Sequence, residues 1–337
     1  MPIHKINGLI VNVCGDVHLG RTFRTGVPLH RLGDREEMVW EDFEQQLNVE
    51  ADLTIVMGDL FDKFVVPPEV VLRAYDLLTT AADNGREIII LRRNHDASRD
   101  STKKSSFDLL RELTWPVEGI LVAERAGYYE IDESWLLFCG WSPDVPAHDD
   151  VSGLCQPDPA HPILAAFGHW DITQHGEDTH NLIPLDALAN LGVGKVFTGH
   201  IHKAEAFTRN GMEVHVVGSM QPYAHGEEPD GSMLYMTLTP EQVEDMLEGD
   251  EDIFADSNVR ILLIDGAEYP REFNCLSRTF KRTLSGVAKV DEEGNPVAAY
   301  DTFDLRTMIS TTLTEFGVSE ALQSRINTTL TEKLSHA

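Results

Sequence analysis

The strongest constraint on the fold is a set of short, almost continuous apolar runs in the first hundred residues. The runs are "GLIVNVC" at 8–14, "ADLTIVM" at 51–57 and "EIIIL" at 87–91. Runs of this length and composition are typical of strands in a sheet that is largely buried. They predict the strands of an α/β fold.

The segments between these runs have the period of amphipathic helices. Between residues 34 and 47, Val39, Phe43 and Leu47 recur at intervals of four. Residues 67–85 open on two prolines, carry an apolar stripe and close on an Asn-Gly stop signal. Alternation of strands and helices predicts a sheet that helices cover on at least one face.

Beyond a short helix expected at 106–113, the chain becomes richer in strand-like runs. These are "GYYEI", "WLLFCGW", "HPILAAFG", "KVFTG", "MEVHVVGS" and "SMLYMTL". Their density predicts a second sheet packed on the first.

Charge and cysteine content limit the classes of function. The 27 Lys and Arg residues against 56 Asp and Glu residues give a formal net charge of -29, which argues against broad adhesion to nucleic acid or to an anionic membrane. Any DNA binding needs local positive features, metal ions or a partner. The four cysteines contain no CxxC pair, so neither a disulfide framework nor a zinc-thiolate site is expected. The first apolar run is too short for a signal peptide or a membrane span, and a cytosolic location is expected.

The last third of the chain predicts a separate small region. Residues 241–256 hold eight acidic residues and no basic one, and are interpreted as a solvated boundary or, alternatively, an acidic surface helix. The strand-like run "NVRILLID" follows, then a basic segment at 269–290 and two helical segments at 303–316 and 319–334. The expected division is a main domain at 1–248, a small α+β capping domain at 249–302 and a helical hairpin at 303–337.

Five of the expected strands end in residues that bind metals or transfer protons. Sites in open α/β sheets form at the carboxyl ends of the strands, so these clusters can converge on one crevice although they lie far apart in the sequence. They are Gly15-Asp16-Val17-His18, Gly58-Asp59-Leu60-Phe61-Asp62, Asn94-His95-Asp96, Gly168-His169-Trp170-Asp171 and Gly199-His200-Ile201-His202.

The side chains of these clusters suit divalent metal ions. Imidazoles and oxygens without a thiolate are typical of manganese, iron or zinc with five or six ligands. Seven candidates exceed the need of one ion, so we expect two ions bridged by a carboxylate, which activate a water for in-line displacement at phosphorus. The candidates are Asp16, His18, Asp59, Asn94, His169, His200 and His202.

His95 adjoins a candidate ligand and has no evident ligand duty of its own. An imidazole beside a two-metal centre can stabilise or protonate the leaving oxygen, so His95 is the candidate catalytic residue. Asp62 and Asp96 are expected to support the ligands from behind, although either alone could cap a loop. One such motif alone is more often structural than catalytic, whereas five in order after apolar strands favour the functional interpretation.

The ordered set resembles the calcineurin-like metallophosphoesterase superfamily, whose members carry D-x-H, GD-x-x-D, GNH-[DE], GH and GH-x-H after successive strands. "GDVHLG", "GDLFD" and the spacing from "GHWD" to "GHIH" are similar to the SbcD-type DNA repair nucleases, above all to the phage recombination endonuclease subunits. The Ser/Thr protein phosphatases fit less well, because Gly follows their first motif directly and their third motif is GNHE. The motifs run from Asp16 to His202, and the similarity of layout extends over nearly the whole chain.

This resemblance implies a four-layer α/β/β/α sandwich of two mixed sheets between helices, with manganese as the metal and magnesium, iron or zinc as substitutes. It further implies that one ion is held by Asp16, His18, Asp59 and His202, and the other by Asp59, Asn94, His169 and His200, with Asp59 bridging and His95 assisting the leaving group.

Relatives of this type hydrolyse DNA as a 3′ to 5′ duplex exonuclease and a single-strand endonuclease, in recombination and repair. They are not membrane-bound, and they act as dimers with an SMC-like ATPase (SbcC-type). The resemblance therefore implies a homodimer within a heterotetramer, located in the bacterial cytoplasm if the chain is phage-encoded. The capping domain would contact DNA, with Arg278, Lys281 and Arg282 as candidates. The terminal helices would dock on the ATPase, packing on their own domain being the alternative.

The chain differs from the third motif of this family at Arg93, where relatives have Gly before Asn-His. A glycine there allows a backbone geometry or a close approach that a side chain resists. Arg93 would either disturb the metal site or point into the cleft and contact a phosphate of DNA. The second is favoured, because every candidate ligand is retained.

Two further functions stay open. The same chemistry could act on small nucleotides or phosphoproteins, which need no tail after residue 256. Alternatively, Arg93 spoils the centre, and the chain is a catalytically weak DNA-end binding subunit.

Overall fold

The computed structural model describes residues 3–93, 96, 102–131, 133–155, 157–158, 160–173, 180–229, 231–264 and 267–283. By its internal contacts the chain divides into two units, Met1–Leu263 with Glu268–Lys281, and Ile264–Ala267 with Arg282–Ala337. Almost all described residues belong to the first unit. The predicted helical hairpin at 303–337 lies outside the described residues.

A five-stranded sheet is formed by the first part of the chain. Its strands are β1 (Ile3–Ile6), β2 (Leu9–Cys14), β3 (Leu53–Val56), β4 (Ile88–Leu91) and β5 (Ile120–Ala123), which lie in this order across the sheet. β1 pairs antiparallel with β2, and all other neighbours are parallel. Every residue of β3 and β4 is buried, as their continuous apolar sequences predict.

A six-stranded mixed sheet follows. Its strands are β6 (Ala126–Ile131), β7 (Ser134–Cys139), β8 (Ile163–Gly168), β9 (Lys195–Thr198), β10 (Glu205–Arg209) and β11 (Met212–Val216), in the spatial order β10-β11-β9-β8-β7-β6. The four central strands are parallel, and the outer pairs β10-β11 and β7-β6 are antiparallel.

Helices cover the outer faces of both sheets. They are α1 (Asp34–Leu47), α2 (Pro68–Asp83) and α3 (Ser106–Thr114) on the first sheet, and α4 (Ala147–Ser152) and α5 (Leu185–Asn190) on the second, with a short 3-10 helix at Leu29–Arg31. α3 begins with a capping box in which the Ser105 side chain accepts from the backbone N–H of Asp108.

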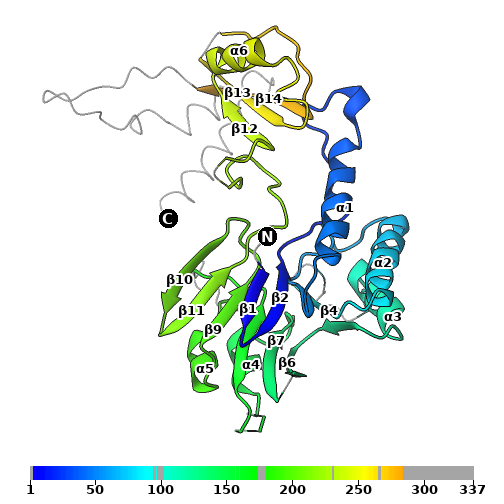
Figure 1. Ribbon diagram of the computed structural model, residues 1–337, viewed down its shortest axis with the longest axis vertical. Coiled ribbons are helices and arrows are strands. Elements are labelled where there is room, and N and C mark those ends of the chain that lie inside the picture. The colour runs from blue at the N-terminus through cyan, green and yellow to red at the C-terminus, as the bar shows by residue number, and fades with distance from the viewer. Residues whose placement is uncertain are drawn as a thin grey trace, which may run out of the picture. The chain divides into compact units, whose positions relative to one another are not determined.

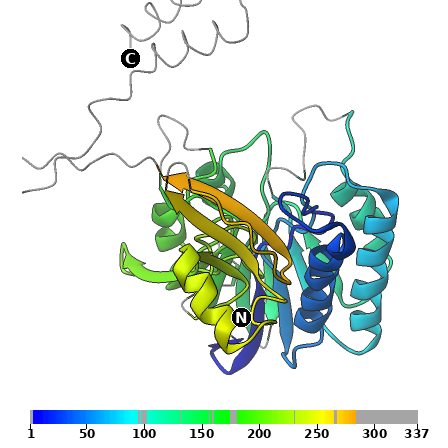
Figure 2. The same ribbon diagram turned by 90° about the horizontal axis from the view of Figure 1, so that it is seen from above.

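Three apolar cores hold these layers together. Phe43 of α1 and Ile90 of β4 belong to the core between the helices and the first sheet. Ile55 of β3 and Phe167 of β8 belong to the core between the two sheets, and Leu188 of α5 to the core beneath the second sheet. The layers are shown in Figure 1, and Figure 2 shows α1 and α2, in blue and cyan, along one outer side. The predicted four-layer α/β/β/α sandwich is therefore confirmed.

A third, smaller sheet comes from the end of the first unit. It consists of β12 (Tyr235–Leu238), β13 (Asn258–Ile264) and β14 (Ser277–Thr283), with α6 (Pro240–Gly249) packed on it. The first half of the acidic stretch is thus helical, which is the alternative considered from the sequence. This sheet takes strands from both sides of residue 248, and the assignment of 249–302 to a capping domain stays a prediction. Each helix among the described residues is too short or too polar to cross a bilayer.

Candidate metal centre

The strand-end clusters meet where the two sheets face each other. Asp16 follows β2 and Asp59 follows β3 in the first sheet, while His169 follows β8 and His202 follows β9 in the second. Parallel pairing brings the ends of neighbouring strands together within each sheet. A bridge between Asp16 and Ser219 then joins the two sheets at this end. The described clusters therefore converge on one site.

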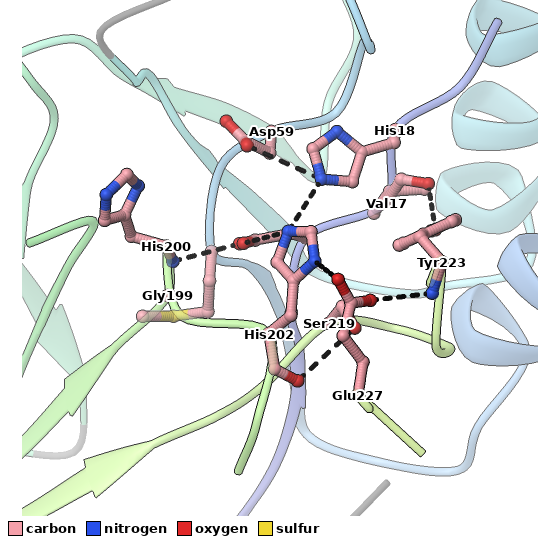
Figure 3. Close-up of polar contacts among 12 residues, drawn as sticks. Val17, His18, Asp59, Gly199, His200, His202, Ser219, Tyr223 and Glu227 are labelled. Carbon is pink, nitrogen blue, oxygen red and sulfur yellow. Dashed lines mark hydrogen bonds and ion pairs between the residues drawn. The ribbon is translucent and has the colours of Figure 1, made fainter. Parts of the chain in front are cut away.

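The first ligand group consists of Asp16, His18 and His202, whose ligand atoms lie within 4.8 Å of one another. Nε2 of His18 is 3.1 Å from Nε2 of His202 (Figure 3). The same nitrogen of His202 is 3.6 Å from Oδ2 of Asp16. Each ring nitrogen is either a donor or a lone-pair acceptor. Two that face each other this closely need a proton or a cation between them.

The second ligand group consists of Asp16, Asp59 and His169, all buried. Nε2 of His169 lies 3.6 Å from Oδ1 of Asp59, and Nε2 of His18 lies 3.7 Å from Oδ2 of the same carboxylate. Asp59 therefore stands between histidines of the two groups, as a bridging carboxylate would. The residue that both groups share is Asp16.

The two groups fit a divalent metal ion. Oδ2 of Asp16 and Nε2 of His169 are buried and make no hydrogen bond to the part of the chain that the structure describes. Buried polar atoms without a partner cost free energy, so their presence in the interior indicates a ligand. Carboxylates with imidazoles are a suitable donor set for manganese, iron or zinc.

Two of the imidazoles are oriented from behind. Nδ1 of His169 lies 2.9 Å from the carbonyl oxygen of Met57, and Nδ1 of His202 lies 3.0 Å from Oε1 of Glu227. A proton held on Nδ1 by such an acceptor leaves Nε2 bare toward the ligand group. Glu227 is held in turn, because its Oε2 accepts the backbone N–H of Tyr223 at 2.8 Å (Figure 3). The sequence interpretation missed Glu227, since it lies in a loop without a strand or motif before it.

Burial changes the proton affinity of the ligands. It raises the pKa of Asp16 to about 6, against the opposing effect of the nearby His202. It lowers the pKa of His169 well below the usual value, so this imidazole is neutral and able to bind a metal.

Backbone strain is concentrated at the same strand ends. His18, Asp59 and His200 have φ angles of 55°, 51° and 75°, in the left-handed region that non-glycine residues rarely adopt. Gly58 has a φ of 111°, and a Cβ there would lie 2.8 Å from Nδ1 of His169. Strain of this kind persists where the surrounding structure enforces it, often at functional sites.

His200 stands outside both ligand groups. Its Nε2 pairs with Oδ1 of Asp171 at 2.8 Å, and this hydrogen bond raises the pKa of His200. Its backbone N–H donates to Oδ1 of Asp16 at 3.2 Å. The predicted ligand role of the His200 imidazole therefore stays a prediction, and Asp171 is the residue that competes for it.

Arg93 is buried at the centre itself. Its guanidinium pairs with both carboxylate oxygens of Asp59. From the sequence, a contact between Arg93 and a phosphate of DNA is favoured. The pairing supports the other alternative, in which Arg93 disturbs the metal site.

The two carboxylates expected behind the ligands are both near the centre. The backbone N–H of Arg93 donates to Oδ2 of Asp96 at 3.0 Å, and burial raises the pKa of Asp96 to about 7. Asp62 lies behind His18, with 3.8 Å between its Oδ1 and the imidazole Nδ1.

The remaining candidates are less defined. Asn94 and His95 lie outside the described residues, so their ligand and catalytic roles stay predictions. Arg278 in β14 forms an ion pair of 2.6 Å with Glu272, while Lys281 and Arg282 are exposed. Their contacts with DNA stay predictions as well.

Comparison with known families identifies the class of the site. The sequence pattern of the calcineurin-like phosphoesterases matches residues 10–204, more than half of the chain, and includes every described ligand. The chain belongs to this family. Among curated proteins, the search found no match.

Solved structures with a similar fold include TT1561 of Thermus thermophilus, with 12% identity, a TM-score of 0.39, and coverage of 62% of this chain and 89% of that one. Phosphopantetheinyl hydrolase (PptH) of Mycobacterium tuberculosis has 12% identity, a TM-score of 0.37, and coverage of 63% and 93%. Neither similarity bears on the substrate.

Membership of the family and the two ligand groups together make the protein a metal-dependent phosphoester hydrolase. A bound divalent ion supplies a Lewis acid and a water of lowered pKa at such a site. The chain's own part is to bring Asp16, Asp59 and the imidazoles of His18, His169 and His202 together as ligands. Glu227 and the carbonyl of Met57 keep the protons of His202 and His169 on the nitrogens that face away from the centre.

Proposed function

We propose that this protein is a manganese-dependent DNA phosphodiesterase, the nuclease subunit of an SbcD-like complex in DNA end processing, recombination and repair. The proposed activities are a 3′ to 5′ exonuclease on duplex DNA and an endonuclease on single strands. The observation that carries the proposal is the pair of ligand groups that share Asp16, formed by motifs similar to those of the SbcD-type nucleases. The resemblance implies two ions bridged by Asp59.

A basic groove beside the centre supports a nucleic-acid substrate. It has a volume of about 260 Å³, and Arg21, Arg24, Arg260 and Tyr223 are among its lining residues. The guanidinium of Arg21 lies 5.0 Å from the centre of the Tyr223 ring, which is itself 5.0 Å from the ring of His18. In a chain with a net charge of -29, this groove is the kind of local positive feature that backbone phosphates require.

The proposed assembly is a homodimer bound to an SMC-like ATPase. Residues 249–302 would contact DNA, and residues 303–337 would dock on the ATPase. The strongly acidic composition is the reason to propose a partner, because the isolated chain has little electrostatic attraction for DNA. Truncation after Asp301 should abolish binding to the ATPase, and unchanged binding would contradict the docking role.

The test is release of nucleotides from end-labelled linear duplex and single-stranded DNA in manganese, beside hydrolysis of a phosphomonoester. We expect DNA cleavage that is lost in His18→Ala, because the first ligand group is broken, and retained in His148→Ala, a histidine of α4 outside both groups. Hydrolysis of the small ester without DNA cleavage would contradict the proposal and support the alternative function, a phosphoesterase for small nucleotides or phosphoproteins.

The pairing of Arg93 with Asp59 favours a second candidate, the catalytically weak DNA-end binding subunit. Absence of both activities in the wild-type chain, with the partner ATPase added, would support that function and contradict the nuclease.

A further inference from the structure

A positive side chain already lies where the second ligand group would bind its ion. The Arg93 side chain is only 5% exposed, and its Nε and one terminal nitrogen face Oδ1 and Oδ2 of Asp59. Oδ1 is also the atom that lies 3.6 Å from Nε2 of His169. The guanidinium and a metal ion at the second ligand group would therefore use the same carboxylate oxygen.

The direction of Arg93 is set by the end of β4. Successive residues of an extended segment point to opposite sides. Arg92 points away from the centre, where its Nε donates to the carbonyl of Trp141 at 3.1 Å and its side chain pairs with Glu124 at 2.7 Å. Arg93 takes the other direction, and the bond from its backbone N–H to Asp96 holds that geometry.

The charges of the centre favour one ion when Arg93 is in place. Asp16 and Asp59 supply two negative charges, and the imidazoles of the two ligand groups are neutral when they bind metal. Counted over these two ligand carboxylates, one divalent ion together with Arg93 gives +1 and two ions together with Arg93 give +3. Glu227 and Asp62, which lie behind the imidazoles, lower both sums equally, so the second ion adds two positive charges beside the guanidinium in either case. In a buried site such an excess is poorly screened.

We infer that Arg93 is a resident cation of the second ligand group, so that the resting chain holds one ion tightly, at Asp16, His18 and His202. A second ion binds only when the guanidinium leaves Asp59. The inference deepens the proposed function and rests on its metal dependence, but it does not depend on DNA as the substrate.

The test counts manganese ions without any substrate. Chains stripped with a chelator are titrated with Mn²⁺ by calorimetry and by equilibrium dialysis, for the wild type, Arg93→Ala and Arg92→Ala. We expect one tight ion in the wild type and two in Arg93→Ala, with the affinity for the second ion raised roughly 100-fold or more. Arg92→Ala is the matched control, because it removes the neighbouring arginine from a site away from the centre, and it should behave as the wild type.

Thermal unfolding gives an independent measurement. Without metal, Arg93→Ala should unfold at a lower temperature than the wild type, because Asp59 loses its buried partner. Saturating Mn²⁺ should raise the unfolding temperature of Arg93→Ala more than that of the wild type. Arg93→Gln, which keeps a long polar side chain without the charge, should show the same two effects if the alanine variant folds poorly.

Two tight ions in the wild type, or an unchanged count in a folded Arg93 variant, would overturn the inference. Neither result would contradict the proposed nuclease, whose test is DNA cleavage. Conversely, a wild type that binds one tight ion and does not cleave DNA would support the inference and contradict DNA as the substrate.

Discussion

Single residues behind the ligands set how the centre binds metal. Glu227 keeps the proton of His202 on Nδ1, and loss of such a carboxylate partner lowers metal affinity about 10- to 100-fold. We therefore predict a loss of that size in the Mn²⁺ affinity of Glu227→Gln, measured by calorimetry, with an unchanged fold. Glu228→Gln is the control, because Glu228 binds the backbone N–H of Gly226. An equal loss of Mn²⁺ affinity in both variants would mean that Glu227 acts by holding the loop at residues 223–228 and not through His202.

The proton affinity of Asp16 predicts a stability change with pH. Its pKa is raised to about 6 from an ordinary value near 3.8, so the protonated form stabilises the metal-free fold. That stabilisation is complete below pH 3.8 and is lost as the pH rises through 6. Asp16→Asn cannot ionise. In chelator, its stability relative to the wild type should therefore increase by up to about 3 kcal/mol between pH 4 and pH 7.

Urea unfolding at both pH values measures this difference. At pH 7, Mn²⁺ should stabilise the wild type more than Asp16→Asn, because only the wild-type carboxylate binds the ion. A difference between the two chains that does not change with pH would show that Asp16 ionises normally.

At the scale of strands and helices, close contact between the sheets depends on the glycine that follows β2. A Cβ on Gly15 would lie 1.7 Å from the carbonyl oxygen of Gly218, which is backbone and cannot turn aside. We predict that Gly15→Ala destabilises the fold by at least about 3 kcal/mol, measured by urea unfolding. Gly194→Ala, where no atom of the described residues lies within 4 Å of the added Cβ, should change stability by less than about 1 kcal/mol. Similar values for both would contradict the steric explanation.

The elements that the sequence pattern predicts well are those with a buried face of their own. The helices expected at 34–47, 67–85 and 106–113 correspond to α1, α2 and α3 within a few residues. β1, β5, β10 and β14 were not predicted. All four lie at an edge of a sheet with most of their described residues exposed or half-buried, so their pairing partners, more than an apolar pattern, hold them as strands.

At the scale of the whole molecule, the net charge of -29 opposes the basic groove. We predict that the isolated chain binds duplex DNA only weakly, in the range of about 1–100 μM at physiological salt, with a log–log salt slope near -3 if three arginines contact phosphates. Fluorescence anisotropy at several salt concentrations measures both the dissociation constant and the salt slope. Arg24→Gln with Arg260→Gln should bring the slope to about -1, whereas Arg209→Gln, outside the groove, should leave it unchanged. If the chain binds DNA with nanomolar affinity and the double variant has an unaltered salt slope, the DNA binds outside the groove.

The sequence alone determined the layers of the fold and most of the metal ligands. Alternating apolar strands and amphipathic helices specify a sandwich, and Asp16, His18, Asp59, His169 and His202 stand directly after strands, where parallel pairing must bring them together. Only the tertiary structure decided which partner each side chain takes. Glu227 reaches His202, Asp171 takes the ring of His200, and Arg93 neutralises Asp59. These contacts depend on side-chain direction and on loops whose positions are set by the packing of the two sheets, which no local sequence pattern records.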